Sequence, residues 1–126
     1  MALLTCGVAA GCLGFDYEFD VSNTSPDSYL IRVPIGSPKP GKYFVVSVDP
    51  GATGPALGWY GLIDAPIEVI TTDCQVLSTF QRMPDGTYAA PGIAGLTGTV
   101  GGYAANRHWN NSAMHLRYIC GGTALN

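Results

Sequence analysis

The sequence has few charged side chains. Only 12% of its 126 residues are Asp, Glu, Lys or Arg, whereas about 25% is typical of a soluble domain. The net charge is −3, and the six basic residues are scattered, so a surface for nucleic acid is not expected. A surface with so little charge is often one that another molecule covers.

The motifs of the common enzyme classes are missing as well. There is no Gly-x-Ser-x-Gly turn, no phosphate-binding loop and no His-Glu-x-x-His pair. A catalytic nucleophile needs a base within hydrogen-bond reach, and the chain has only two histidines, His108 and His115. We therefore expect a protein that is not an enzyme and that uses no cofactor.

Long helices and membrane spans are not expected either. The chain contains 17 Gly and 9 Pro, and both residue types interrupt helices. The first 15 residues carry no charged side chain, but their apolar run falls short of the ~18 residues that a membrane span needs.

The clearest pattern that is present is an alternation from residue 15 to residue 21. Successive side chains of a strand point to opposite faces, so the period of two predicts a half-buried antiparallel strand. One face is expected to pack on a core and the other to meet water or a partner. The core face carries Phe15, Tyr17, Phe19 and Val21, and the acidic face carries Asp16, Glu18 and Asp20.

The rest of the chain reads as short strands between turns. Residues 74–82 fit a strand better than the alternative, a short helix capped by Asp73, because Pro84-Asp85-Gly86 predicts a hairpin turn into a strand at 87–89. The glycine-rich residues 92–103 are expected to form an extended loop that packs against another surface. The further strands are expected at 29–33, 43–48, 57–63, 67–71 and 113–120.

About seven or eight strands predict an all-β fold, a single antiparallel β-sandwich or a small barrel with Gly/Pro-rich loops. We expect an apolar N-terminal arm at residues 1–14, a β domain at 15–120 and a C-terminal tail at 121–126. Both ends are expected to be held in place by neighbouring subunits.

The acidic face of the first strand is a weak candidate for a metal site. Asp16, Glu18 and Asp20 lie in a line about 7 Å apart, whereas calcium needs oxygen ligands that converge. A metal would need further ligands, such as Asp49 or Asp64. We favour a solvated acidic face that discourages edge-to-edge pairing of sheets.

Four cysteines leave their oxidation state open. Cys6, Cys12, Cys74 and Cys120 lack the spacing of a zinc or redox motif. The even number allows two disulfides in an oxidising compartment, and single buried thiols are the alternative. On a secretory route, the acceptor pattern Asn23-Thr24-Ser25 would also be relevant to glycosylation.

Aromatic side chains next to amides suggest carbohydrate binding as the alternative function. Flat rings stack on the apolar faces of sugars while neighbouring polar groups fix orientation. The competing interpretation is that the two tryptophans are packing residues, which is the commoner role of large rings. The candidate residues are Trp59, Tyr60, Trp109, Asn110 and Asn111.

In its whole-chain character the sequence resembles the small all-β accessory proteins of bacteriophage virions, such as head-decoration (cement) or minor tail proteins. The resemblance implies a virion location and many copies that stabilise joints between subunits, with other copies and other structural proteins as partners. The alternative is a secreted protein that binds a surface glycan. The apolar side chains expected at the interfaces are Leu3, Leu4, Val8, Leu13, Ile35, Ile93, Leu96, Val100 and Leu125.

Overall fold

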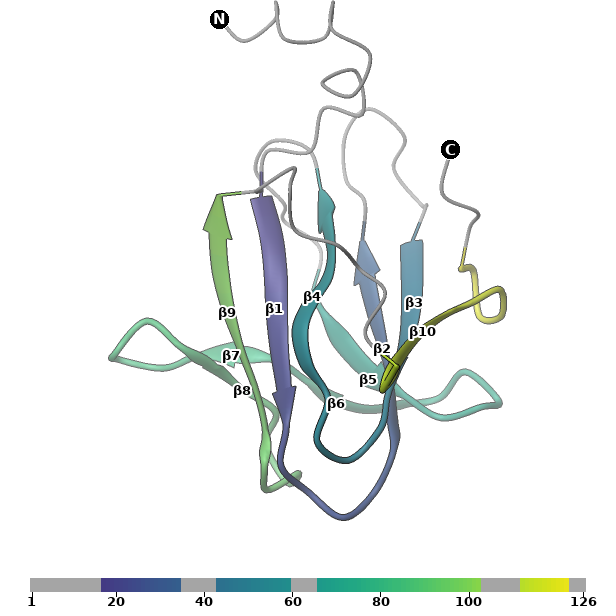
Figure 1. Ribbon diagram of the computed structural model, residues 1–126, viewed down its shortest axis with the longest axis horizontal. Coiled ribbons are helices and arrows are strands. Elements are labelled where there is room, and N and C mark those ends of the chain that lie inside the picture. Colours follow the sequence, from purple (N-terminus) through teal and green to yellow (C-terminus); the bar gives the residue numbers. More distant parts are fainter. Residues whose placement is uncertain (1–16, 35–42, 60–65, 103–111, 123–126) are drawn as a thin grey trace, which may run out of the picture.

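The computed structural model describes residues 17–34, 43–59, 66–102 and 112–122. These residues form ten strands in two antiparallel sheets of five strands each, which pack as a β-sandwich (Figure 1). The all-β prediction is confirmed. The predicted arm at residues 1–14 lies outside the described residues.

The first sheet has the order β4-β1-β9-β8-β7. The strand β1 is hydrogen-bonded to β4 on one side and to β9 on the other. The strands are β1 (Tyr17–Asn23), β4 (Thr53–Trp59), β7 (Gln81–Arg82), β8 (Tyr88–Ala89) and β9 (Leu96–Gly102).

The second sheet has the order β10-β3-β2-β5-β6. Its middle strand is β2, and next to it lies the near-continuous apolar run of β3, which is buried at five of six positions, as the sequence predicted for a strand covered on both faces. The strands are β2 (Tyr29–Pro34), β3 (Tyr43–Val48), β5 (Glu68–Ile70), β6 (Val76–Thr79) and β10 (Met114–Arg117).

The main core lies between the two sheets. Phe19 and Val21 of β1 are buried there, which confirms the predicted core face over the part of that strand that the structure describes. The second sheet contributes alternate residues of β2, β3 and β5, because alternate side chains of each strand share a face. These residues are Ile31, Val33, Phe44, Val46, Val48 and Val69.

Residues 96–102 form the middle strand of the first sheet, so the prediction of an extended glycine-rich loop is wrong. The physical reason lies at Gly98, where an added Cβ would approach Cζ of Phe19 to 2.2 Å. The missing side chain makes room for the Phe19 ring, which meets Phe80 and Tyr88 edge-on at 5.0 and 5.9 Å. Because glycine has no side chain, it leaves space for the large Phe19 ring. For the same reason the sequence does not show the alternation that predicts a strand here.

The acidic face of β1 also differs from its prediction. Glu18 is only 2% exposed and Asp20 is half-buried, whereas both were expected on a face open to water or a partner. Moreover, β1 is paired on both sides and has no open edge for its carboxylates to protect. Alternation fixes the face that a side chain takes, but it does not fix whether that face stays open to solvent.

The strand expected at residues 74–82 is two strands, which accounts for part of the rise from eight strands to ten. The chain leaves the second sheet after β6, inserts Phe80 into the core, and enters the first sheet as β7. The hairpin turn before β8 is confirmed, with Met83 and Thr87 hydrogen-bonded through their backbones. This hairpin and the turn between β5 and β6 project on opposite sides of the sandwich (Figure 1).

Two strand boundaries shift from those expected. The strand expected to begin at residue 57 begins at Thr53 and includes Pro55, which an edge strand tolerates because one side of it has no partner. The strand expected at 113–120 ends at Arg117, where the chain leaves the sheet edge.

Candidate functional site

The outer face of the second sheet is partly covered by the chain that follows β10. We call residues 118–122 the crossover. Leu30, Val45 and Ile70 form a small apolar cluster on this face, and Ile119 and Cys120 of the crossover pack against them. Gly122 then pairs with Tyr43, so the first residues of the predicted C-terminal tail lie on their own domain.

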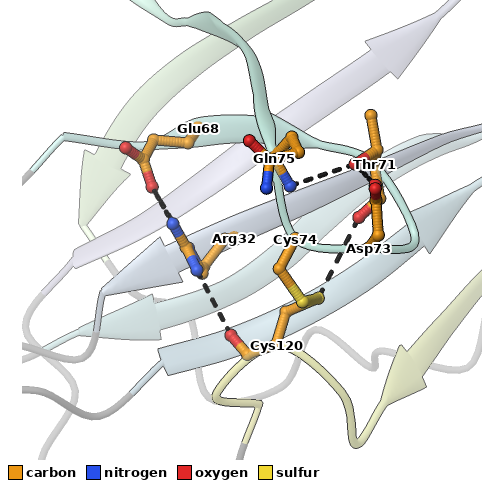
Figure 2. The surroundings of a disulfide bond; sticks show 7 residues. All are labelled: Arg32, Glu68, Thr71, Asp73, Cys74, Gln75 and Cys120. Carbon is orange, nitrogen blue, oxygen red and sulfur yellow. Dashed lines mark hydrogen bonds and ion pairs between the residues drawn. A yellow bond between two sulfur atoms is a disulfide. The ribbon is translucent and has the colours of Figure 1, made fainter.

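A disulfide joins the crossover to the turn between β5 and β6. Cys120 pairs with Cys74, which is 46 residues earlier in the chain (Figure 2). The sequence had left both the oxidation state and the pairing open. Cys6 and Cys12 lie outside the described residues.

Polar contacts hold the crossover at the same place. Arg32 of β2 donates hydrogen bonds to Glu68 Oε1, at 2.6 and 3.1 Å, and to the carbonyl oxygen of Cys120, at 3.3 Å (Figure 2). Its guanidinium also lies 5.1 Å from the ring centre of Tyr43. Arg32 is therefore fully engaged in fixing the structure.

Both disulfide cysteines have the left-handed backbone conformation, with φ of 70° at Cys74 and 53° at Cys120. Cys74 occupies the last loop position of a three-residue hairpin turn closed by Thr71 and Gln75, where glycine is usual. Apart from glycines, these two are the positive-φ residues of the described chain. The disulfide therefore requires a side chain at two positions whose positive φ favours glycine.

A groove of about 460 Å³ lies on the same face, next to the small apolar cluster that the crossover packs against. Leu30 of β2, Ser47 of β3 and Ile70 of β5 line it, and their positions alternate with core residues of the same strands. His115 and Arg117 of β10 line it on one side. The groove thus extends across most of the sheet.

The opposite side and the end of the groove are mostly polar. Thr71 and Thr72 of the disulfide turn line it together with Leu77 of β6. At one end Ser28 donates a 2.9 Å hydrogen bond to Asp49 Oδ1. The groove therefore combines an apolar floor with a cation, a carboxylate and several hydroxyl groups.

The edge strand β6 exposes two consecutive apolar side chains. Val76 is 50% exposed and Leu77 is 55% exposed. Ser78 pairs with Val69 and Val76 pairs with Ile70, so Leu77 is the extra residue of a β-bulge. The strand sequence Val-Leu-Ser-Thr contains neither charge nor proline.

The other sheet edges carry features that discourage pairing with a second sheet. The strand β4 contains Pro55, β7 is two residues long and contains Arg82, and β10 ends in Arg117. Among the described edge strands, β6 is thus the one with the fewest features that discourage pairing. The sequence did not reveal it, because which strands lie at an edge depends on the order of strands in the sheet.

Three of the apolar residues predicted at an interface lie in the described chain, and they differ in how exposed they are. Leu96 is 1% exposed and belongs to the core, so its assignment to an interface is wrong. Ile93 is half-buried against the same core, and Val100 is 37% exposed. The remaining candidates lie outside the described residues: Leu3, Leu4, Val8, Leu13, Ile35 and Leu125.

Of the predicted sugar-binding residues, the structure describes only the backbone of Trp59. Trp59 is the last residue of β4, where its backbone pairs with Tyr17. The other candidates, Tyr60, Trp109, Asn110 and Asn111, lie outside the described residues, as does Asp16 of the acidic face. Across the described ranges, no three His, Cys, Asp or Glu side chains gather as a metal site requires.

The glycosylation acceptor pattern at Asn23 has a structural role instead. The side chain is fully buried, and its Nδ2 donates to the carbonyl oxygens of Asp27 and Val48. Its Oδ1 accepts hydrogen bonds from the backbone N–H and the hydroxyl of Ser25. An amide with all four hydrogen bonds made inside the fold is not open to modification.

Comparison of the chain with protein-family models, with curated proteins and with solved structures finds no match. Within the ranges that the structure describes, no helix has the length and apolar character needed to cross a membrane. The second sheet carries two surface features that bear on function, the β6 edge and the groove.

Proposed function

We propose that this chain is a non-enzymatic structural subunit of a larger assembly, of the kind that decorates or joins the parts of a bacteriophage virion. The observation that carries the proposal is the β6 edge, with Val76 and Leu77 half exposed on an uncharged strand. An open edge with adjacent apolar side chains favours association with another chain.

The partner that best fits this edge is a second copy of the chain. Two β6 strands that meet antiparallel about a two-fold axis bring no like charges face to face, because Val76–Thr79 carries none. Asp73 lies in the turn before the strand and Arg82 lies in β7 of the other sheet, so neither charge belongs to the β6 edge.

The energetic argument is burial of apolar surface. Each large apolar side chain that is fully removed from water contributes roughly 1.5–3 kcal/mol, less the cost of ordering. A two-fold contact buries Val76 and Leu77 twice. Such a contact is modest by itself, and repetition over many copies in a particle makes it effective.

The proposal is tested by light scattering during size-exclusion chromatography. The wild-type chain is expected to elute as a dimer or larger species, and Val76→Lys is expected to be monomeric because a charge at the contact would be buried. Thr99→Lys adds the same charge at an exposed position of the other sheet and is expected to leave the mass unchanged.

Two results would contradict the proposal. One is a wild-type chain that stays monomeric at high concentration. The other concerns the particle itself: mass spectrometry of purified virions whose genome encodes this chain is expected to find it in many copies, and its absence from them would remove the virion assignment.

A further inference from the structure

We propose that the groove on the outer face of the second sheet binds an acidic saccharide, with the sugar carboxylate at Arg117 and sugar hydroxyl groups at Asp49. The inference does not rest on assembly through β6: Val76 does not line the groove, although Leu77 of the same edge does. Its residues are not those that the sequence suggested for carbohydrate binding.

The cationic side of the groove carries the first argument. Arg117 and His115 are exposed, and both line the groove from the same strand. Among the described residues, Arg32 forms an ion pair with Glu68, whereas no hydrogen bond or ion pair engages the guanidinium of Arg117. An available guanidinium above an apolar floor fits a planar carboxylate, which it can bind through two parallel hydrogen bonds.

The carboxylate at the groove's end carries the second argument. Asp49 is half-buried, and its backbone N–H donates to Ala113 while its carbonyl oxygen accepts from Ala52, so its position is fixed. An ionised carboxylate only accepts hydrogen bonds, so a ligand that reaches Asp49 must bring donors. Sugar hydroxyl groups are donors, whereas a fatty acid has none to offer there.

The floor between these two ends carries the third argument. Leu77 supplies exposed apolar surface, Leu30 and Ile70, which are 7% and 2% exposed, close the floor beneath it, and Thr72 and Ser47 supply hydroxyl groups. A pyranose ring has an apolar C–H face and a polar rim, so it matches a floor of this mixed kind. The strands β10 and β5 are three inter-strand distances apart, or about 14 Å. The groove therefore has room for more than one sugar unit.

The test uses isothermal titration calorimetry with short oligomers of galacturonic acid. The wild-type chain is expected to bind these oligomers, and Arg117→Gln is expected to weaken binding by at least about tenfold, because it removes the charged hydrogen bonds. Asp49→Asn is expected to weaken binding too. Arg82→Gln removes an equal charge outside the groove and should bind as the wild type does.

Neutral and aliphatic probes separate the possible ligands. The methyl-esterified oligomers are expected to bind the wild-type chain as weakly as the acidic oligomers bind Arg117→Gln, and octanoate is expected not to bind. The inference is overturned if no saccharide binds at millimolar concentration, if octanoate alone binds, or if Arg117→Gln and Arg82→Gln behave alike. Thermal unfolding of each variant confirms that it is folded.

The same titration distinguishes this inference from the proposed function. Val76→Lys is expected to lose self-association and to keep its affinity for the galacturonic acid oligomers. If it keeps self-association and loses sugar binding, both assignments of surface are wrong. Arg117→Gln is expected to show the reverse, with sugar binding lost and the oligomeric mass kept.

Discussion

Gly98 shows at the scale of one residue how the core is built around a missing side chain. The ring of Phe19 lies over this glycine and contacts Phe80 and Tyr88 edge-on. Because two other rings pack against Phe19, it has little room to move away from a new atom. A methyl group at residue 98 would therefore meet a fixed obstacle.

We expect Gly98→Ala to lower the free energy of unfolding by about 1–3 kcal/mol, the usual cost of forcing extra volume into a packed core. Gly101→Ala is the matched control, because it lies in the same strand and an added Cβ there has no atom within 4 Å. Urea unfolding followed by fluorescence measures both. Equal stability of the two variants would contradict the packing argument.

Asn23 illustrates a second residue-scale feature that the sequence did not disclose. Its buried amide links the end of β1 to Val48 of β3, and therefore joins the first sheet to the second. Sequence reasoning treated the same residue as part of a glycosylation pattern. A local pattern cannot show burial, which depends on the distant strand that supplies the hydrogen-bond acceptor.

The disulfide belongs to the scale of elements, since it ties the β5–β6 turn to the chain after β10. Closing a loop of this length stabilises the fold by about 2–4 kcal/mol, mainly by restricting the unfolded chain. The backbone at both cysteines opposes this gain, because side chains are disfavoured at positive φ.

The cost of positive φ at the two cysteines can be measured with two double variants. Cys74→Ala with Cys120→Ala is expected to lose about 2–4 kcal/mol of stability in urea unfolding. Cys74→Gly with Cys120→Gly loses the same cross-link, yet we expect it to be more stable than the alanine pair by about 1 kcal/mol, because glycine accepts positive φ. An alanine pair that equals or exceeds the glycine pair would contradict the strain argument.

At the scale of elements the sequence predicted strands well where alternation or continuous apolar character was strong, as in β1, β2 and β3. It failed at β9, because Gly98 and Gly101 replace the side chains that would reveal a period of two. It also failed to separate β6 from β7, since the change of sheet at Phe80 leaves no mark in local hydrophobicity.

The candidate site was less predictable than the fold for a related reason. Most of the groove comes from residues on five different strands and from the turns between them, so their neighbourhood depends on sheet order and register. Arg117 carries no signal in the sequence, and Asp49 was considered there only as a further metal ligand. Only the fold brings the two residues to one groove, where we propose that they bind one ligand. The β6 edge likewise depends on the fold.

At the scale of the whole molecule, the two sheets have different surfaces. The described outer face of the first sheet includes Asp20, Ser22, Thr97 and Thr99. The second sheet carries the disulfide, the groove and the open β6 edge. We therefore place both proposed interactions, with a second copy and with a saccharide, on one half of the sandwich.

The most direct test of the central claim is light scattering of the wild-type chain beside Leu77→Lys, which places a charge on the exposed part of the β6 edge. The wild-type chain is expected to be a dimer or larger, and Leu77→Lys is expected to weaken self-association, because a charge there would be buried at the contact. If Leu77→Lys keeps the wild-type mass, the chain does not associate through β6.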